Sequence, residues 1–384
     1  MHLLSVVLMV LLGLVAVVPV AHAQLAISVN DNKVVLDNGT AKVVPNPAPD
    51  TVTIIDLKAN PPRVVAEIKA PASVVGPPLS VALTPDESLA LVTAAQKIDP
   101  ADPTKRVPDN KVSVIDLKAN PPAVIATLEA GASPAGLSIN RQGTLALVAN
   151  RAEGTVSVFT IQGKTVTPAG KVTIADAKSG VSHVTIAPDG KLALVSRDGD
   201  DRISVLSIDG TKVEYTKRDM NAGLRPYGID IASNGVFAAV ANIGRGQGDA
   251  DTVSLIDLKA NPPRVVETLT VGQTPEGIKV SPDNQHVAVV VMNGSNKAKS
   301  SPFYNDNGKL VMLRVSGTSL AKVAEAPIGH WSQGAAFSPD GKTVLVGNMV
   351  EKDVQVFAWD GRTLRETARI KVNGGSAALR TAEK

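Results

Sequence analysis

The amino-acid sequence predicts an all-β protein, and three observations support this prediction. Segments of alternating apolar and polar residues, rich in Val, Ile and Thr, recur along the chain and are typical of short strands. A tight turn ending in Gly, or in Glu or Asn at the same place, returns seven times at intervals of 45 to 57 residues. No segment after residue 23 keeps a helical period. Four strands repeated seven times predict a seven-bladed β-propeller of four-stranded antiparallel blades.

The repeated turn separates the first two strands (A and B) of each unit, and strands C and D follow. In one unit, "GLSIN" and "TLALVAN" flank the turn "NRQG", and "TVSVFTI" and "VTPAGKVTI" complete the blade. We expect the propeller to extend over residues 24–372 and residues 373–384 to form a disordered tail. The seven turns end at Gly39, Glu87, Gly143, Gly190, Gly235, Asn284 and Gly341. An Asn follows by seven positions in four units, as Asn46, Asn150, Asn242 and Asn348.

One segment is written twice without change. The residues "IDLKANPPRVV" occur at Ile55–Val65 and again at Ile256–Val266, with a near copy at Ile115–Ile125. Proline fixes φ and lacks an N–H group, so Asn-Pro-Pro suits a wide turn whose amides need no ladder partner. We interpret these copies as the C–D turns of duplicated blades, and therefore as part of the scaffold.

The first 23 residues have the pattern of an export signal. An apolar run ends at Ala21-His22-Ala23, which has the small-x-small form of a signal-peptidase site. We expect residues 1–23 to be a signal peptide cleaved before Gln24, giving a periplasmic or secreted protein with no membrane span. The alternative is an uncleaved anchor helix, because the run is just long enough to cross a bilayer.

Composition excludes several classes of function. The chain has no Cys, which rules out disulfides, thiolate metal sites and covalent haem attachment through a C-x-x-C-H motif. Its formal charge is only +3, and aromatic residues make up 3% of it. Nucleic-acid partners usually need a concentrated basic patch or stacking aromatics, so they are not expected. We expect a monomer whose partner is a small anionic molecule or an extracytoplasmic protein.

The repeat resembles a known family. The strand ends "LVAN", "AVAN" and "LVGN", the "TVSVIDL"-type strands and the "SPDG" turns are similar to the YVTN β-propeller repeat, over nearly the whole chain after residue 23. Three units depart from its Asn, with Ala94, Arg197 and Val291 instead. The resemblance implies an exported propeller. Related propellers include lactonases and the large subunits of quinoprotein dehydrogenases, so the resemblance implies an activity only weakly.

Residues that depart from the repeat are the candidates for a ligand site. In this strand order the D–A and B–C loops share one face, which carries most of the variation between blades. Arg supplies paired donors to a carboxylate, and aromatic side chains form an apolar wall. A cluster of both at the channel mouth would suit a small organic anion. The candidates are Arg151, His183, Arg197, Asp198, Arg225, Tyr227, Arg245, His330 and Trp331.

Other interpretations of these residues stay open. Single Arg and His side chains on loops are often only solvated, and Trp331 could simply plug the channel. No cofactor is predicted. A divalent metal at His183 and His330 would need a carboxylate such as Asp198 or Glu276 to complete it. A quinone cofactor is a further alternative. The remaining metal candidates are the acidic residues Asp198, Asp200 and Asp249.

Three functional hypotheses follow. The first is a binding or scaffold module whose variable face takes a small anion or a partner protein. The second is a lactonase-like hydrolase in which His183 or His330 is the general base and a nearby Arg stabilises the oxyanion. The third is a redox-associated propeller. Separately, Asp230 and Lys279 hold equivalent strand A positions in adjacent blades and predict an ion pair that fixes register.

Overall fold

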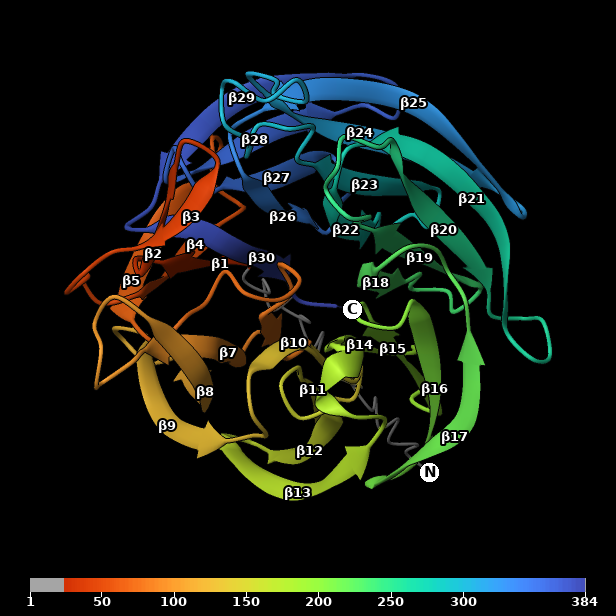
Figure 1. Cartoon of the computed structure of the whole chain (residues 1–384). Coiled ribbons are helices and arrows are strands. Elements are labelled where there is room, and N and C mark those ends of the chain that lie inside the picture. Colours follow the sequence, from red (N-terminus) through yellow and green to blue (C-terminus); the bar gives the residue numbers. More distant parts are fainter. Residues whose placement is uncertain (1–23, 384) are drawn as a thin grey trace, which may run out of the picture.

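The strands form seven four-stranded sheets around a central axis in the computed structural model, which describes residues 24–383 (Figure 1). Within every sheet, neighbouring strands are antiparallel, as in blade 3. One 3-10 turn, at Ala177–Ser179, is the single helical segment in the described part of the chain. The prediction of an all-β, seven-bladed propeller is therefore confirmed.

Strands A to D of each blade run from the axis to the rim. Blade 1 contains β30 (Gly375–Thr381), β1 (Leu25–Asp31), β4 (Thr51–Asp56) and β5 (Arg63–Lys69). Blade 2 contains β6 (Val81–Leu83), β7 (Leu89–Ile98), β8 (Arg106–Asp116) and β9 (Ala123–Glu129). Blade 3 contains β10 (Pro134–Ile139), β11 (Leu145–Asn150), β12 (Thr155–Gln162) and β13 (Thr165–Thr173).

The other four blades follow the same order without interruption. Blade 4 contains β14 (Val181–Ile186), β15 (Leu192–Arg197), β16 (Arg202–Asp209) and β17 (Lys212–Met220). Blade 5 contains β18 (Pro226–Ile231), β19 (Phe237–Asn242), β20 (Asp251–Asp257) and β21 (Arg264–Gly272). Blade 6 contains β22 (Pro275–Val280), β23 (His286–Val291), β24 (Gly308–Ser316) and β25 (Ser319–Ile328). Blade 7 contains β26 (Ser332–Phe337), β27 (Thr343–Asn348), β28 (Asp353–Trp359) and β29 (Leu364–Lys371).

The ring is closed by the C-terminal segment, which was expected to be a disordered tail. That expectation was wrong for residues 375–381, because β30 forms the innermost strand of blade 1 and all seven of its residues are buried. It pairs with β1 from Ala26 opposite Thr381 to Asp31 opposite Gly375. Without β30, β1 would present an unpaired edge to the axis, a liability that closed rings avoid.

Ring closure changes the assignment of the first repeat. The turn ending at Gly39 joins a separate hairpin, β2 (Val34–Asp37) and β3 (Thr40–Val43), instead of strands A and B of blade 1. Asn46 is accordingly exposed. The equivalent of the repeated Asn in blade 1 is Asn30, whose amide donates to the hydroxyls of Thr51 (3.0 Å) and Thr53 (2.8 Å).

The repeated Asn ties the end of strand B to strand C. Asn150 Nδ2 donates to Thr155 Oγ1 and Ser157 Oγ, each at 2.9 Å, and its Oδ1 accepts from Gly131 N–H. The two donations to strand C recur at Asn242 and Asn348, and Asn348 Oδ1 also accepts from Gly329 N–H. Buried polar groups need such partners, so this residue is structural in every blade that has it.

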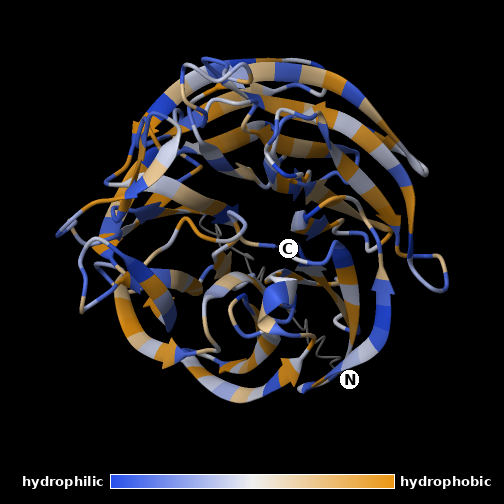
Figure 2. Ribbon diagram, viewed as in Figure 1, coloured by the Kyte–Doolittle hydropathy of each residue, from blue (hydrophilic) through white to orange (hydrophobic). Residues whose placement is uncertain are grey.

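The core lies between the sheets. Figure 2 shows apolar and polar residues alternating along the strands, which places one set of side chains against the neighbouring blade. Leu147 and Val158 of blade 3 pack with Val184 and Leu206 of blade 4, for example. Full burial of such a side chain contributes about 1.5–3 kcal/mol. No helix long and apolar enough to cross a membrane occurs among residues 24–383.

Buried side chains also fill the middle of the central channel. Leu79 of blade 2 is 2% exposed and reaches blade 5, where its Cδ1 would lie 3.7 Å from a Cβ built on Gly228. His183 of blade 4 is fully buried against Gly136 of blade 3. The channel therefore has two separate ends, a mouth on the D–A and B–C face and a cavity on the A–B and C–D face.

Candidate functional site

The mouth is polar on one side and apolar on the other. Equivalent positions near the start of strand A carry polar side chains in four consecutive blades, as Ser182, Tyr227, Glu276 and Gln333. The three remaining blades carry Leu79, Ala135 and Ala377 at this position. Comparing the seven blades at this position would have identified Glu276, Ser182 and Gln333 from the sequence. A position with the same structural role in every blade should not be polar in four blades and apolar in three.

Asp198 is the centre of the polar half. Its side chain is 2% exposed and accepts two hydrogen bonds from Arg151, at 2.5 and 2.9 Å, and one from Arg225 at 2.9 Å. Ser182 donates a further bond of 2.5 Å. Burial alone would raise the pKa of Asp198, but these donors and the two positive charges hold it below its usual value. The carboxylate therefore stays ionised and orients both guanidinium groups.

The local backbone explains why Arg225 points at the mouth. It is the residue before strand A of blade 5 and has a positive φ of 56°, and its N–H donates to Asp201 Oδ1 at 2.8 Å. Ser133, Thr274 and Trp331 precede their A strands with the same left-handed conformation, at φ of 50° to 55°. The conformation belongs to the repeat, and only the side chain it carries differs between blades.

Tyr227 forms the wall beneath Arg151. The guanidinium carbon lies 5.6 Å from the ring centroid, which is within the range of a cation–π contact. The side chain is 7% exposed, and burial raises its pKa, so the hydroxyl stays protonated and can donate. The opposing positive charge of Arg151 is too small an effect to reverse this.

Glu276 has a strongly displaced acid–base equilibrium that falls near neutral pH. Loss of solvation raises its pKa to about 7, against the neighbouring Gln333 amide and the charges of Arg225 and Arg151, and Asp198 raises it further. The side chain is surrounded by protein and still keeps partial contact with solvent. From the sequence, Glu276 was a candidate only as a metal ligand. In the structure it is a carboxyl group that changes charge near neutral pH.

The two histidines do not join this cluster. His183 is 0% exposed, and burial together with the charges of Arg380 and Lys279 holds its pKa well below the usual value. It is thus out of reach of a molecule in solvent, which removes it as a general base. The His330 ring nitrogen Nδ1 lies 2.6 Å from Glu351 Oε1 within blade 7. Trp331 donates its backbone N–H to Ser295 Oγ at 3.2 Å.

The other predicted residues lie apart from Asp198. Arg197 turns to the outer strands of blade 4, where it pairs with Asp200 and Asp219. Arg245 and Asp249 are exposed on the B–C loop of blade 5. Within residues 24–383, no three His, Asp or Glu side chains are gathered so that they could hold a metal ion.

The predicted ion pair between adjacent blades is present. Lys279 Nζ lies 3.0 Å from both carboxylate oxygens of Asp230, and Val280 N–H donates to Asp230 Oδ2 at 2.8 Å. Both side chains lie deep in the channel, with 13% and 2% exposure for Lys279 and Asp230. The pair fixes the register of strands A in blades 5 and 6.

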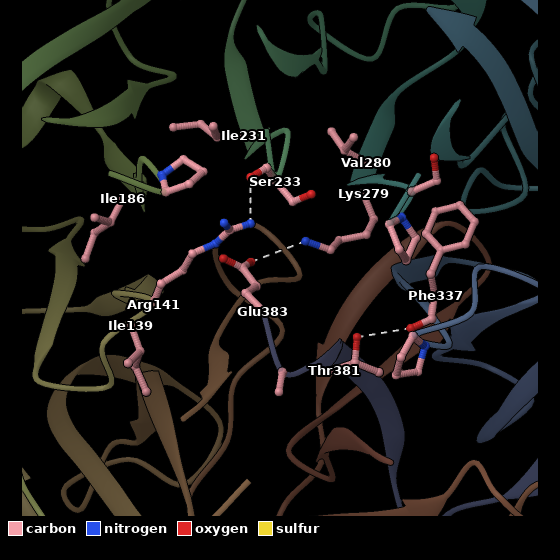
Figure 3. A pocket seen from close by; sticks show the side chains of 15 residues that line it. Ile139, Arg141, Ile186, Ile231, Ser233, Lys279, Val280, Phe337, Thr381 and Glu383 are labelled. Atoms are coloured by element: carbon pink, nitrogen blue, oxygen red, sulfur yellow. Dashed lines mark hydrogen bonds and ion pairs between the residues drawn. The ribbon is translucent and has the colours of Figure 1, made fainter. Parts of the chain in front are cut away.

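A cavity of about 130 Å³ occupies the other end of the channel, on the face of the A–B turns (Figure 3). It was not anticipated, because the sequence analysis placed any ligand site on the opposite face. One signal could have revealed it: the turns have Pro at one position in blades 2, 4, 6 and 7, whereas blades 3 and 5 have Arg141 and Ser233. Both of these residues line the cavity.

Comparison with known proteins identifies the fold. No protein-family model and no curated protein match the chain. Among solved structures, a putative 6-phosphogluconolactonase from Bacteroides uniformis is 17% identical with a TM-score of 0.71. The periplasmic gluconolactonase PpgL of Pseudomonas aeruginosa is 18% identical at 0.66, and a functionally unknown Desulfotomaculum acetoxidans protein is 15% identical at 0.68. Each match covers 94% of this chain and 99% of the other. At these identities the likeness shows the propeller fold alone.

Proposed function

We propose that this propeller is an exported binding protein that takes a small organic anion at the channel mouth. One observation supports the proposal most strongly. Arg151 and Arg225 converge on the single carboxylate of Asp198, beside a carboxyl group, Glu276, whose pKa is about 7. While Glu276 is protonated, two guanidinium charges against one carboxylate leave one net positive charge at the mouth, and ionisation of Glu276 above about pH 7 cancels it.

The exposed edges of the arginines supply the contact with the anion. The side chains of Arg151 and Arg225 are 23% and 34% exposed, although Asp198 beneath them is buried. Each guanidinium has five N–H donors, so those not used by Asp198 can bind a carboxylate or phosphate. The Tyr227 hydroxyl adds a neutral donor.

Glu276 makes the binding depend on pH. Below about pH 7 its carboxyl group is neutral and donates a hydrogen bond to an anion. Above that pH it is charged and repels the same anion. Affinity should therefore decrease as pH rises through about 7.

A second function, hydrolysis of a lactone, rests on the same carboxyl group. A general base works best with a pKa near the working pH, and Glu276 meets that condition beside two cationic groups that could stabilise an oxyanion. The likeness to propellers named as lactonases is in keeping with it. This function has the opposite pH dependence, because the ionised base is the active form.

Location is part of the proposal. Residues 1–23, whose pattern indicates a signal peptide, lie outside the described residues. The likeness in fold to a periplasmic gluconolactonase supports export. A protein partner on the same face is the alternative occupant.

The test uses D-gluconate and D-glucono-1,5-lactone as probes with residues 24–384. A ligand at a hundred times its dissociation constant adds about 2.7 kcal/mol of stability, which thermal unfolding detects readily. Gluconate should stabilise the wild type and should do so much less for Arg225→Gln. The matched control is Arg202→Gln, because Arg202 is exposed at the start of β16 on the same face.

Two outcomes would change the account. If neither probe shifts the unfolding temperature, or if both variants respond like the wild type, the small-anion proposal fails. Release of acid from the lactone that is abolished by Glu276→Gln would favour the hydrolase over the binding protein.

A further inference from the structure

We propose that the cavity on the A–B face is a second ligand site, specific for a small carboxylate with a short apolar body. The chain's own Glu383 occupies its carboxylate position. This inference does not depend on the proposed function, because the two sites lie at opposite ends of a channel whose middle is filled by Leu79 and His183.

The wall of the cavity is apolar and built by the repeat. Equivalent residues at the end of strand A in five consecutive blades contribute their side chains, as Figure 3 shows. They are Ile139, Ile186, Ile231, Val280 and Phe337. The cavity, of about 130 Å³, has room for a short aliphatic chain against this apolar wall.

The charged side of the cavity is formed by Lys279 and Glu383, which line it, and by the buried Asp230 and Arg380, which pair with them. Lys279 Nζ lies 3.2 Å from Glu383 Oε1 in addition to its two contacts with Asp230. Arg380 is 2% exposed and pairs with Glu383, while its Nε and Nη1 atoms have no hydrogen-bond partner. A buried guanidinium with unused donors is costly unless an anion is present. Glu383 supplies that anion.

The rim of the cavity carries a third cation. Arg141 stands where other blades have Pro188, Pro282 or Pro339, and its Nη2 donates to the carbonyl oxygen of Ser233 at 2.6 Å. In Figure 3 its guanidinium extends over the cavity toward Glu383. Three cations face two carboxylates, those of Asp230 and Glu383, so the cavity keeps one net positive charge when Glu383 is bound.

The Glu383 side chain, which occupies the carboxylate position, indicates the class of ligand. Beyond its Cα atom, a glutamate side chain is a carboxylate on two methylene groups, which is the skeleton of propionate. A free short-chain carboxylate presents the same group to Lys279 and Arg380 and places its methylenes against the apolar wall. It must displace Glu383 to bind, so the wild type should bind such a molecule weakly.

The experiment compares butyrate binding in the full chain and in Glu383→Ala. We expect Glu383→Ala to unfold at a lower temperature than the wild type, because Arg380 loses its partner, and butyrate to restore the difference. Isothermal titration should give an affinity for butyrate at least about tenfold higher in Glu383→Ala than in the wild type. Chloride at equal ionic strength and butylamine should have no such effect.

Substitution of Arg141, on the rim of the cavity, tests whether butyrate binds in this cavity. Adding Arg141→Gln to Glu383→Ala should lower butyrate affinity about fivefold or more. The matched control, Arg362→Gln, removes an exposed arginine from a C–D turn of the same face and should leave it unchanged. If Glu383→Ala does not fold, the same titrations are made with Glu383→Gln, for which a smaller increase in affinity is expected.

The inference is overturned if the Glu383 variant binds butyrate no more tightly than the wild type, or if Arg141→Gln has no effect. Its failure is distinguishable from failure of the proposed function. Arg225→Gln should strongly reduce the response to gluconate and leave the response to butyrate intact.

Discussion

At the scale of single residues, a side chain of one blade occupies the space that a glycine leaves free in the neighbouring blade. Gly136 of blade 3 has no side chain where a Cβ would collide with the imidazole of His183, and blades 5 and 6 have Gly where blade 4 has His183. From the sequence, His183 stood out as a departure from the repeat and was interpreted as a ligand contact. The structure shows that the departure fills the channel. A residue that differs from the repeat marks an unusual position. Its burial in the structure then decides whether solvent can reach it.

This packing predicts a coupled pair of substitutions. Gly136→Ala should destabilise the protein by about 1–3 kcal/mol, because the new methyl group overpacks a full core. In a His183→Gly background the same change should cost less, with a remainder because the new methyl group would still lie 2.9 Å from the Cα atom of residue 183. A double-mutant cycle measured by urea unfolding checks this, and an equal cost in both backgrounds would contradict the contact.

Glu276 predicts a specific dependence of stability on pH. Its pKa in the folded state, about 7, lies above the ordinary 4.5, so the protonated form stabilises the fold. That contribution is complete below about pH 4.5 and is lost as pH rises through about 7. Relative to Glu276→Gln, the wild type should lose up to roughly 2–3 kcal/mol between pH 5 and pH 8. Parallel stability curves for the two proteins would show that the carboxyl group titrates normally.

At the scale of elements, the repeat was predictable in six units and misplaced in one. The turns that end at Glu87, Gly143 and their equivalents join strands A and B as expected, but the turn at Gly39 belongs to the added hairpin. Asn30 could not be recognised as the repeated Asn, because its strand A partner is at the other end of the chain. In a closed ring the sequence repeat looks the same whichever strand begins the chain. The repeat therefore does not show which blade contains both ends of the chain.

The corrected assignment of the repeat predicts which Asn stabilises the fold. Asn150→Ala should cost about 1–3 kcal/mol, because two strand C hydroxyls lose their partner and the Gly131 N–H keeps only its 3.2 Å bond to Ser157 Oγ. Asn46→Gly, the control on the exposed surface, should change stability by less than about 0.5 kcal/mol, because Gly tolerates the left-handed φ of 48° at this position. Chemical unfolding of both variants distinguishes the two assignments, and similar costs would favour the original one.

Strand β30 predicts a sharp limit to C-terminal truncation. Residues 24–381 should fold, because they retain the whole of β30. Residues 24–373 should not form a stable ring, because β1 loses its entire inner partner and buried side chains such as Leu379 are removed. Circular dichroism and thermal unfolding of the two truncated proteins check this. Equal stability would mean that β30 contributes nothing to closure.

At the scale of the whole molecule, fold and function were not equally predictable. Alternation and turn spacing are local properties, so seven blades followed from the sequence. Arg151, Asp198, Arg225 and Tyr227 were predicted to share a face, and they do lie together. The cavity around Arg141 was not foreseen, because its wall is made of residues that are scaffold in every blade.

The central claim is that the mouth binds an organic anion next to a carboxyl group that titrates near neutrality. The most direct test is isothermal titration of D-gluconate between about pH 5.5 and 8.5 in the wild type and in Glu276→Gln. We predict that the affinity of the wild type decreases through about pH 7 and that the affinity of Glu276→Gln does not change over this range. Affinity that is independent of pH in both proteins, or absent in both, would contradict the account.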